Sequence, residues 1–141
     1  MQLKPAITNI SSNTAADHKI KNLKILITED DQDSVFFLSR SLEPYCREIL
    51  IAGTGVEAVE ACRNNPDIDL VMMDIRMPEL DGYSATRQIR EFNTDVIIIA
   101  QTAFAMTGDR QKAIEAGCND YISKPSDGTL LLELIRKHLK A

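Results

Sequence analysis

Short, continuous runs of apolar residues recur along the chain from Lys24 onward, and each is followed by a segment with helical spacing. The five runs are residues 25–27, 49–52, 70–73, 96–100 and 121–122. Because their apolar residues are continuous rather than alternating, they are typical of parallel strands that are buried on both faces of a sheet. Parallel strands need helical crossovers, so the pattern predicts an α/β fold.

Between the runs, apolar residues recur at the spacing of amphipathic helices. The stripes are Val35, Leu38 and Leu42; Ala58, Val59 and Cys62; Ala85, Ile89 and Phe92; and Leu131, Ile135 and Leu139. Thr54 and Glu57 form a capping box for the second helix. Asp81 is a suitable N-cap for the third helix, and Gly117 a suitable stop for the fourth. Five βα units predict a doubly wound, five-stranded parallel sheet, and the acidic residues described below favour the strand order 2-1-3-4-5.

Composition limits the classes of protein to which this chain can belong. Hydrophobic residues make up 44% of the 141 residues, enough for the core of one domain, and the net charge of −5 argues against a nonspecific nucleic-acid binder. Cys46, Cys62 and Cys118 are widely spaced, which argues against a disulfide framework or a zinc site. No apolar run reaches the length of a membrane span, so we expect a cytoplasmic chain that binds neither nucleic acid nor membrane.

The first 22 residues differ from the rest of the chain. They are rich in Asn, Ser, Thr and Ala and show no sustained periodicity. We therefore expect a flexible tail or interdomain linker over residues 1–22 and one domain over residues 23–141. An ordered helix over residues 15–23 is the alternative.

Acidic residues follow two of the predicted strands, at the edge where an open α/β sheet binds its ligands. Glu29 and Asp30 follow the first strand, and Asp74 ends the third. Thr102 at the end of the fourth strand and Lys124 after the fifth add a hydroxyl and an ammonium group to the same edge. Two carboxylates about 4–5 Å apart repel by roughly 3–4 kcal/mol at an effective dielectric constant of about 20. A hard divalent cation with oxygen ligands, such as Mg²⁺, is the natural compensation.

Four segments together resemble the receiver domain of two-component response regulators. They are residues 25–30 (ILITED), 74–82 (DIRMPELDG), 101–103 (QTA) and 120–125 (DYISKP), and the resemblance covers residues 23–139. Each segment alone is weakly specific, but together they fill all five functional positions of the family in order. The resemblance implies the flavodoxin-like receiver fold. It also implies a phosphoacceptor domain with self-phosphorylation and dephosphorylation chemistry, rather than an enzyme.

The resemblance implies a role for each matching residue around the metal. Asp30 corresponds to the direct Mg²⁺ ligand, and Glu29 to an acidic partner that acts through water. Asp74 supplies a further ligand, and Arg76 contributes its backbone carbonyl. Mn²⁺ is an alternative ion. Glu29 departs from the Asp that is most common at its position in the family.

Other matching residues correspond to the phosphoryl chemistry. Asp74 corresponds to the carboxylate nucleophile that forms an acyl phosphate. Thr102 donates its hydroxyl to the phosphoryl group, and Lys124 pairs with Asp74 and then binds phosphoryl oxygens. Tyr121 corresponds to an aromatic residue that changes rotamer on phosphorylation. Ser126 departs from the apolar residue that is usual there, which puts a partner contact in doubt.

Competing interpretations explain some of the same residues. Asp31 and Asp33 are interpreted as acids at a helix N-terminus rather than metal ligands. A phosphatase of the haloacid dehalogenase type would need an acid two residues after its nucleophile, where this chain has Arg76. A flavodoxin-like flavin carrier would need a hydroxyl-rich phosphate loop after the first strand, where this chain has Glu29 and Asp30. A degenerate receiver used only for docking is disfavoured because every functional position is filled.

The resemblance also implies partners. A histidine kinase or a histidine phosphotransfer domain would supply the phosphoryl group. The fourth helix, fifth strand and fifth helix form a face that could make a homodimer. Residues 83–90 and 116–125 look most like receivers fused to hybrid sensor histidine kinases, and a stand-alone single-domain regulator is the alternative.

Overall fold

The computed structural model describes residues 22–124 and 128–139. Its elements are, in chain order, β2 (Leu23–Thr28), α2 (Gln32–Leu42), the 3₁₀ helix η2 (Glu43–Tyr45), β3 (Cys46–Ala52), α3 (Gly55–Asn64), β4 (Leu70–Asp74), α4 (Gly82–Arg90), β5 (Ile97–Thr102), α5 (Asp109–Ala116), β6 (Asp120–Ser123) and α6 (Gly128–Leu139). The strands form one sheet in the order β3-β2-β4-β5-β6, and every neighbouring pair is parallel. This is the predicted order 2-1-3-4-5, so the prediction of a doubly wound sheet is confirmed. The tail or linker expected over residues 1–22 falls almost wholly outside the described residues and stays a prediction.

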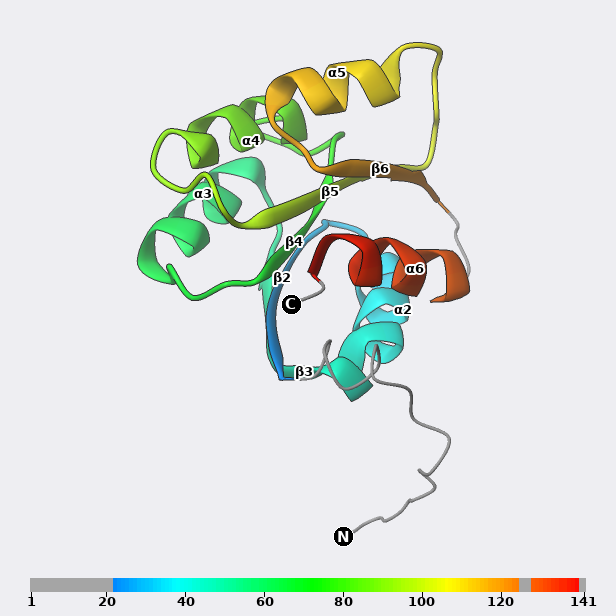
Figure 1. Ribbon diagram of the computed structural model, residues 1–141. Helices are drawn as coiled ribbons and strands as arrows, with labels where there is room; N and C mark the ends of the chain where they lie inside the picture. The colour runs from blue at the N-terminus through cyan, green and yellow to red at the C-terminus, as the bar shows by residue number, and fades with distance from the viewer. Residues whose placement is uncertain (1–21, 125–127, 140–141) are drawn as a thin grey trace, which may run out of the picture.

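Helices cover both faces of the sheet (Figure 1). α3, α4 and α5 lie on one face, and α2 and α6 lie on the other. Each face has its own apolar core, because successive side chains of a buried strand point to opposite sides. Leu26 and Val71 pack into the core beneath α3, α4 and α5, whereas Ile25 and Ile27 pack into the core beneath α2 and α6. β2, β4 and nearly all of β5 are thus buried on both faces, as their continuous apolar runs predicted. The same prediction was wrong for β3, because it is an edge strand whose residues are mostly exposed or half-buried, and Ile51 is 49% exposed.

The predicted helix starts are confirmed by side-chain caps. Asp31 caps α2 by accepting a hydrogen bond from the Ser34 N–H at 2.9 Å, and Asp81 caps α4 in the same way. Thr54 caps α3 by accepting from the Glu57 N–H at 3.0 Å. The Glu57 carboxylate reaches back to the N–H of Gly53 at 2.7 Å, one residue earlier than in a regular capping box.

The apolar stripe predicted for the third helix, Ala85, Ile89 and Phe92, is only partly confirmed. Ala85 and Ile89 are buried in the core, but Phe92 lies beyond the end of α4 and is 38% exposed. Its ring instead lies under the guanidinium of Arg63, 4.5 Å from ring centroid to the Arg63 Cζ atom. The helix ends before its next turn could bring Phe92 onto the sheet.

Glycine at the start of α4 holds the loop after β4 in place. A Cβ atom at Gly82 would lie 2.5 Å from the carbonyl oxygen of Asp74 and 2.6 Å from Cα of Ile75. The Gly82 N–H also donates to the carbonyl of Ile75 at 3.1 Å. The helix start therefore packs directly on the backbone of the residue that ends β4, which only glycine permits.

Candidate phosphoryl and metal site

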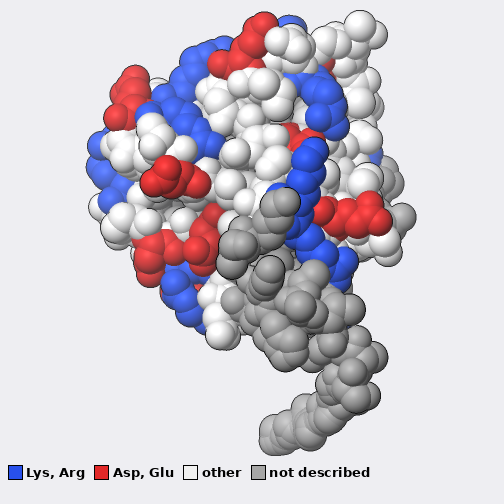
Figure 2. Space-filling model, in the orientation of Figure 1, with Lys and Arg blue, Asp and Glu red and all other residues white. Residues whose placement is uncertain are grey.

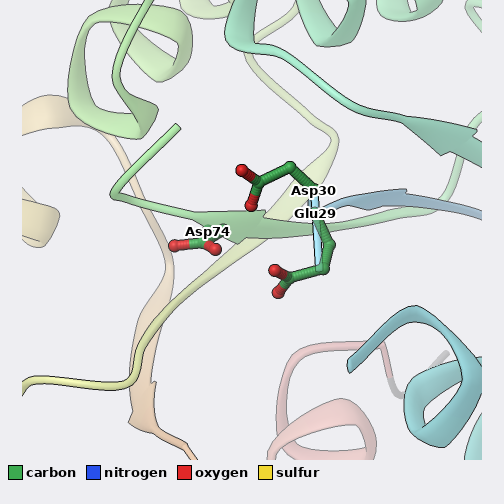
Figure 3. A group of neighbouring side chains, drawn as sticks. All are labelled: Glu29, Asp30 and Asp74. Carbon is green, nitrogen blue, oxygen red and sulfur yellow. The ribbon is translucent and has the colours of Figure 1, made fainter. Parts of the chain in front are cut away.

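The acidic residues expected after the first and third strands come together at one edge of the sheet. β2 and β4 are parallel neighbours, so their carboxyl ends lie side by side. Figure 3 shows Glu29 and Asp30 just beyond β2 and Asp74 at the end of β4, with their carboxylates around one shared space. One oxygen from each of the three carboxylates lies within 4.8 Å of the others. Glu29 and Asp74 are buried, whereas Asp30 is exposed, so the cluster opens to solvent on the side of Asp30.

Lys124 reaches the acidic cluster from the end of β6. Its Nζ atom lies 2.6 Å from Oε1 of Glu29 and 3.3 Å from Oδ2 of Asp74. The ammonium group is therefore shared between the two buried carboxylates and lies closer to Glu29. Within the described residues, three carboxylates face one ammonium group, which leaves a surplus of two negative charges.

Burial has the largest effect on the charges of the Glu29 and Lys124 pair. Burial raises the pKa of Glu29, the Lys124 hydrogen bond opposes that rise, and the charge of Asp74 adds to it. Burial also opposes the charge on Lys124, but hydrogen bonds and charges from Glu29 and Asp74 outweigh it and raise the pKa of Lys124. Lys124 is therefore a fixed positive charge at neutral pH.

The backbone and side chain of Arg76 point in different directions. Its N–H donates to Oδ1 of Asp74 at 2.9 Å. Its guanidinium donates to the carbonyl of Phe104 at 3.2 Å and lies 3.6 Å from the carboxylate of Asp109. Asp109 is buried and also accepts a hydrogen bond from the Tyr83 hydroxyl at 3.0 Å. The Arg76 side chain is thus held away from the acidic cluster, and only the backbone of this residue lies beside it.

Thr102 ends β5, the strand beside β4, and is fully buried. Its neighbour Gln101 pairs with Asp74 across the two strands, which places Thr102 one residue further along the same edge. Its hydroxyl oxygen accepts from the Phe104 N–H at 3.2 Å, and no hydrogen bond between Thr102 and Asp74 occurs in the described part of the chain. The structure therefore brings Thr102 to the same end of the sheet as Asp74, without a hydrogen bond between the two in the described part of the chain.

Tyr121 lies in β6 and packs against the core beneath α3, α4 and α5. Its hydroxyl oxygen is enclosed and has no hydrogen-bond partner among the residues described. Burial, and then the nearby charge of Asp109, raise the pKa of this hydroxyl. The rotamer change expected on phosphorylation stays a prediction, and it would start from a hydroxyl that is already enclosed.

A cleft of about 500 Å³ opens beside the acidic cluster. Asp30, Asp74 and Lys124 line it on one side, and Phe37 and Leu38 of α2 line it on the other. Asp31 and Asp33 also line the cleft, but Asp31 is used as the cap of α2 and Asp33 lies in its first turn, as expected. The cleft thus combines a charged end with an apolar wall.

Gln101 is a site residue to which the sequence patterns assigned no role. Its side chain is only 2% exposed, and its Nε2 atom donates to Oε1 of Glu29 at 3.3 Å. A buried polar residue directly before Thr102, in a strand that is otherwise apolar, was the available signal. The direction of its side chain toward β2 depends on the sheet and could not be read from spacing.

Comparison with known proteins gives a consistent result. Residues 25–136 match the family model of the response regulator receiver domain. The chain is 36% identical to hybrid signal transduction histidine kinase B of Dictyostelium discoideum, over 92% of this chain and 7% of that protein. It is 32% identical to the polar-differentiation response regulator DivK of Brucella ovis, over 82% of this chain and 94% of that protein. The chain thus spans a small fraction of the kinase and nearly all of the regulator.

Solved structures have the same fold. The receiver domain of sensor histidine kinase PA1611 from Pseudomonas aeruginosa, with a magnesium ion in its active site cleft, is 34% identical with a TM-score of 0.75, over 84% of this chain and 98% of that chain. The Saccharomyces cerevisiae complex of Ypd1 with the Ssk1 receiver domain gives 30% identity and a TM-score of 0.77, over 85% of this chain and 90% of that chain.

Charges of both signs lie on the surface. On the face shown in Figure 2, acidic side chains lie among basic ones, and several basic side chains follow one another in a narrow band down its right-hand part. Within residues 22–124 and 128–139, no helix is long and apolar enough to cross a membrane.

Proposed function

This chain belongs to the response regulator receiver domain family of two-component phosphorelay signalling, and on that premise we propose that Asp74 is its phosphoacceptor. The observation that carries the proposal is the position of Asp74. It ends β4, is only 5% exposed, and lies between the Lys124 ammonium and the Asp30 carboxylate at the cleft. A buried carboxylate with an adjacent fixed cation suits a nucleophile that must become an acyl phosphate.

We propose that Mg²⁺ binds at the acidic cluster. The residues fit this ion, because three carboxylate oxygens lie within 4.8 Å of one another and carry a surplus of negative charge. Asp30 and Asp74 would be direct ligands with the backbone carbonyl of Arg76, and Glu29 would act through water. The bound ion would neutralise charge on the transferring phosphoryl group. Mn²⁺ prefers the same oxygen ligands and is an alternative ion.

The side chains then divide the work of phosphoryl transfer. A carboxylate oxygen of Asp74 attacks phosphorus in line with the donor, and the bond from phosphorus to the donor imidazole nitrogen breaks with its electron pair going to that nitrogen. Lys124, 3.3 Å from Asp74, would bind a phosphoryl oxygen. Thr102 would give up its contact with the Phe104 N–H, and its hydroxyl would donate a hydrogen bond to a second phosphoryl oxygen. When water hydrolyses the acyl phosphate, Lys124 and Thr102 would lose their contacts with the phosphoryl oxygens and return to their starting contacts.

We propose that a histidine kinase or histidine phosphotransfer domain donates the phosphoryl group through the cleft beside α2. Phe36 and Phe37 are 63% and 45% exposed, and Phe37 lines the cleft. An exposed aromatic pair next to a reactive group suits a protein partner rather than solvent. The Ypd1–Ssk1 complex supports this class of partner, since its receiver is similar to this chain.

A second face is proposed for output. Phe104 and Met106, in the loop between β5 and α5, are 74% and 65% exposed, and Leu130 in α6 is 45% exposed. We propose that a homodimer or an output partner binds this face once the domain is phosphorylated, with Tyr121 changing rotamer in between. Relatives include both a hybrid kinase and a stand-alone regulator. We favour a hybrid kinase as the parent of this chain, with the stand-alone regulator as the alternative.

Intact mass after incubation with acetyl phosphate tests the phosphoacceptor. We expect one added phosphoryl group in the presence of Mg²⁺, none with EDTA, and none for Asp74→Asn. Asp67→Asn, at the opposite edge of the sheet, is the matched control and should behave like the wild type. Uptake by Asp74→Asn at the wild-type rate would refute the assignment.

A further inference from the structure

Glu29 accepts hydrogen bonds from three donors. Oε2 accepts from the Asp31 N–H at 3.2 Å. Oε1 accepts from both Lys124 Nζ at 2.6 Å and Gln101 Nε2 at 3.3 Å. Because Glu29 is only 2% exposed, a donor that leaves is not replaced by bulk solvent but by another donor within the site, either a protein group or a water held by the proposed metal.

The Lys124 ammonium cannot keep its closest contact with Glu29 and also move to a phosphoryl group on Asp74. It lies 2.6 Å from Glu29 and 3.3 Å from Asp74, so its resting position favours Glu29. The proposed function requires the ammonium to bind phosphoryl oxygens on Asp74. Moving there weakens its contact with a buried carboxylate, and a buried acceptor that loses its donor is costly.

Gln101 can stay in place while Lys124 moves. It lies inside β5, its carbonyl accepts from the Ile75 N–H at 3.0 Å, and its backbone pairs with Asp74 across the sheet. Its side chain is buried at 2% exposure. An amide also suits this position because it donates a hydrogen bond without adding positive charge. A second cation there would reduce the surplus negative charge that attracts Mg²⁺.

We infer that Gln101 is a positioning residue that keeps Oε1 of Glu29 hydrogen-bonded when Lys124 moves to the phosphoryl group. This inference rests on the proposed function and adds to it a residue that acts through Glu29 and Lys124 rather than on phosphorus. Gln101 lowers the cost of releasing Lys124, so it should speed phosphoryl transfer while leaving Mg²⁺ binding largely unchanged.

The test is a cycle of Gln101→Met, Lys124→Met and the double variant, with acetyl phosphate as the donor at saturating Mg²⁺. Met nearly preserves the shape of Gln and removes its donor. We expect Gln101→Met to slow phosphorylation by roughly tenfold, the value of one hydrogen bond to a charged group. The Mg²⁺ concentration for half-maximal rate should change by less than about twofold, and the affinity for beryllofluoride should fall with the rate. In the Lys124→Met background, Gln101→Met should have no further effect, because no ammonium remains to be released.

Matched controls separate this inference from a general loss of structure and from the proposed function itself. Thr86→Val removes a buried hydroxyl that contacts Cys118 away from the site, and it should leave the rate unchanged. A Gln101→Met rate within twofold of wild type would overturn the inference. So would an equal slowing in the Lys124→Met background, or a matching change in Mg²⁺ half-saturation. Failure of the wild type to take up phosphate, or uptake by Asp74→Asn, would instead refute the proposed function.

Discussion

A lysine lies among acids beside each end of β2, buried in the case of Lys24 and partly buried in the case of Lys124, and the two clusters differ in charge balance. At the amino end, Lys24 Nζ lies 3.0 Å from Asp67 and 3.6 Å from Glu48, and Arg47 lies 3.5 Å from Asp67. Two cations thus form ion pairs with two carboxylates, while a third carboxylate, that of Asp69, accepts a hydrogen bond from the backbone N–H of Lys24 at 2.9 Å. At the carboxyl end, Lys124 pairs with Glu29 and Asp74, whose cluster also includes Asp30, and it is the one cation that the described residues place there.

We infer from this difference that the Lys24 cluster stabilises the fold, whereas the Lys124 cluster is the proposed ligand site. Lys24 also donates to Asn65 at 3.0 Å, so its ammonium is satisfied by neighbours and the cluster needs nothing further. The cluster with Lys124 keeps two uncompensated negative charges, which a divalent cation would match. Buried lysine and acidic neighbours alone therefore do not mark a functional site, whereas an unbalanced charge at a cleft does.

The largest expected difference is in the rate of phosphoryl transfer. Lys124→Met should slow phosphorylation by acetyl phosphate by about a hundredfold or more, because one preorganised cation is lost from the reacting group. Lys24→Met, at the other end of β2, should change the rate by less than about twofold. Rates from intact mass, at a temperature where circular dichroism shows both variants folded, check this. Equal slowing in both variants would abolish the distinction between the two ends.

Bound Mg²⁺ should stabilise the folded protein through the acidic cluster at the carboxyl end of β2 and not through the cluster at its amino end. At a Mg²⁺ concentration about 100 times its dissociation constant, the free energy of unfolding should rise by about 2.7 kcal/mol. Asp30→Asn should lose most of that gain, and Glu48→Gln should keep it. Urea melts with Mg²⁺ and with EDTA measure both. If Glu48→Gln also loses the stabilisation by Mg²⁺, the claim that only the cluster with Lys124 binds the ion is wrong.

The two ends should also respond oppositely to pH in EDTA. The pKa of Glu29 is raised from its ordinary value of 4.5, so the folded state binds its proton more tightly, and this group lowers stability as pH rises from about 4.5 toward the folded-state pKa. The pKa of Asp67 is lowered from 3.8 by Lys24, so this group adds stability above 3.8 that is lost as pH falls through its lower folded-state pKa. Urea midpoints of Glu29→Gln and Asp67→Asn across pH 3–6 should diverge from wild type in these opposite directions. Parallel shifts would count against the assigned charge balance.

The smallest expected effect is on the free energy of unfolding in EDTA, through repulsion among the three carboxylates of the cluster. Asp30→Asn should raise the free energy of unfolding in EDTA by up to about 1 kcal/mol, because it removes one of three like charges. The gain is small because Asp30 is exposed and solvent screens it. Glu48→Gln should instead lower stability slightly, since it removes a balanced charge. A loss of stability in Asp30→Asn would argue that the cluster is not repulsive.

Most of the fold could be predicted because it depends on local patterns. Continuous apolar runs predicted the doubly buried strands β2, β4 and β5 correctly, but they did not predict that β3 is a partly exposed edge strand. Residues such as Asp81 and Gly117 mark helix ends that the structure confirms. The meeting of Glu29, Asp30 and Asp74 followed from strand order, since parallel neighbours end at one edge.

Other features depend on side-chain directions that no spacing encodes. Gln101 turns toward Glu29 across the sheet. The guanidinium of Arg76 turns away to Asp109, and the Thr102 hydroxyl bonds the Phe104 N–H rather than Asp74. The directions of the Gln101 and Arg76 side chains are fixed by contacts between elements far apart in the sequence, whereas the Thr102 hydroxyl is held by a residue two positions later.

The central claim is that Asp74, among the carboxylates at one edge, takes the phosphoryl group. Borohydride reduces an acyl phosphate to the alcohol, which marks the modified residue permanently. The phosphorylated protein would be reduced, digested and mapped by mass spectrometry. The account predicts one modified position, Asp74, only when Mg²⁺ was present. Modification at Glu29, Asp30 or Asp31 instead, or equal modification in EDTA, would contradict it.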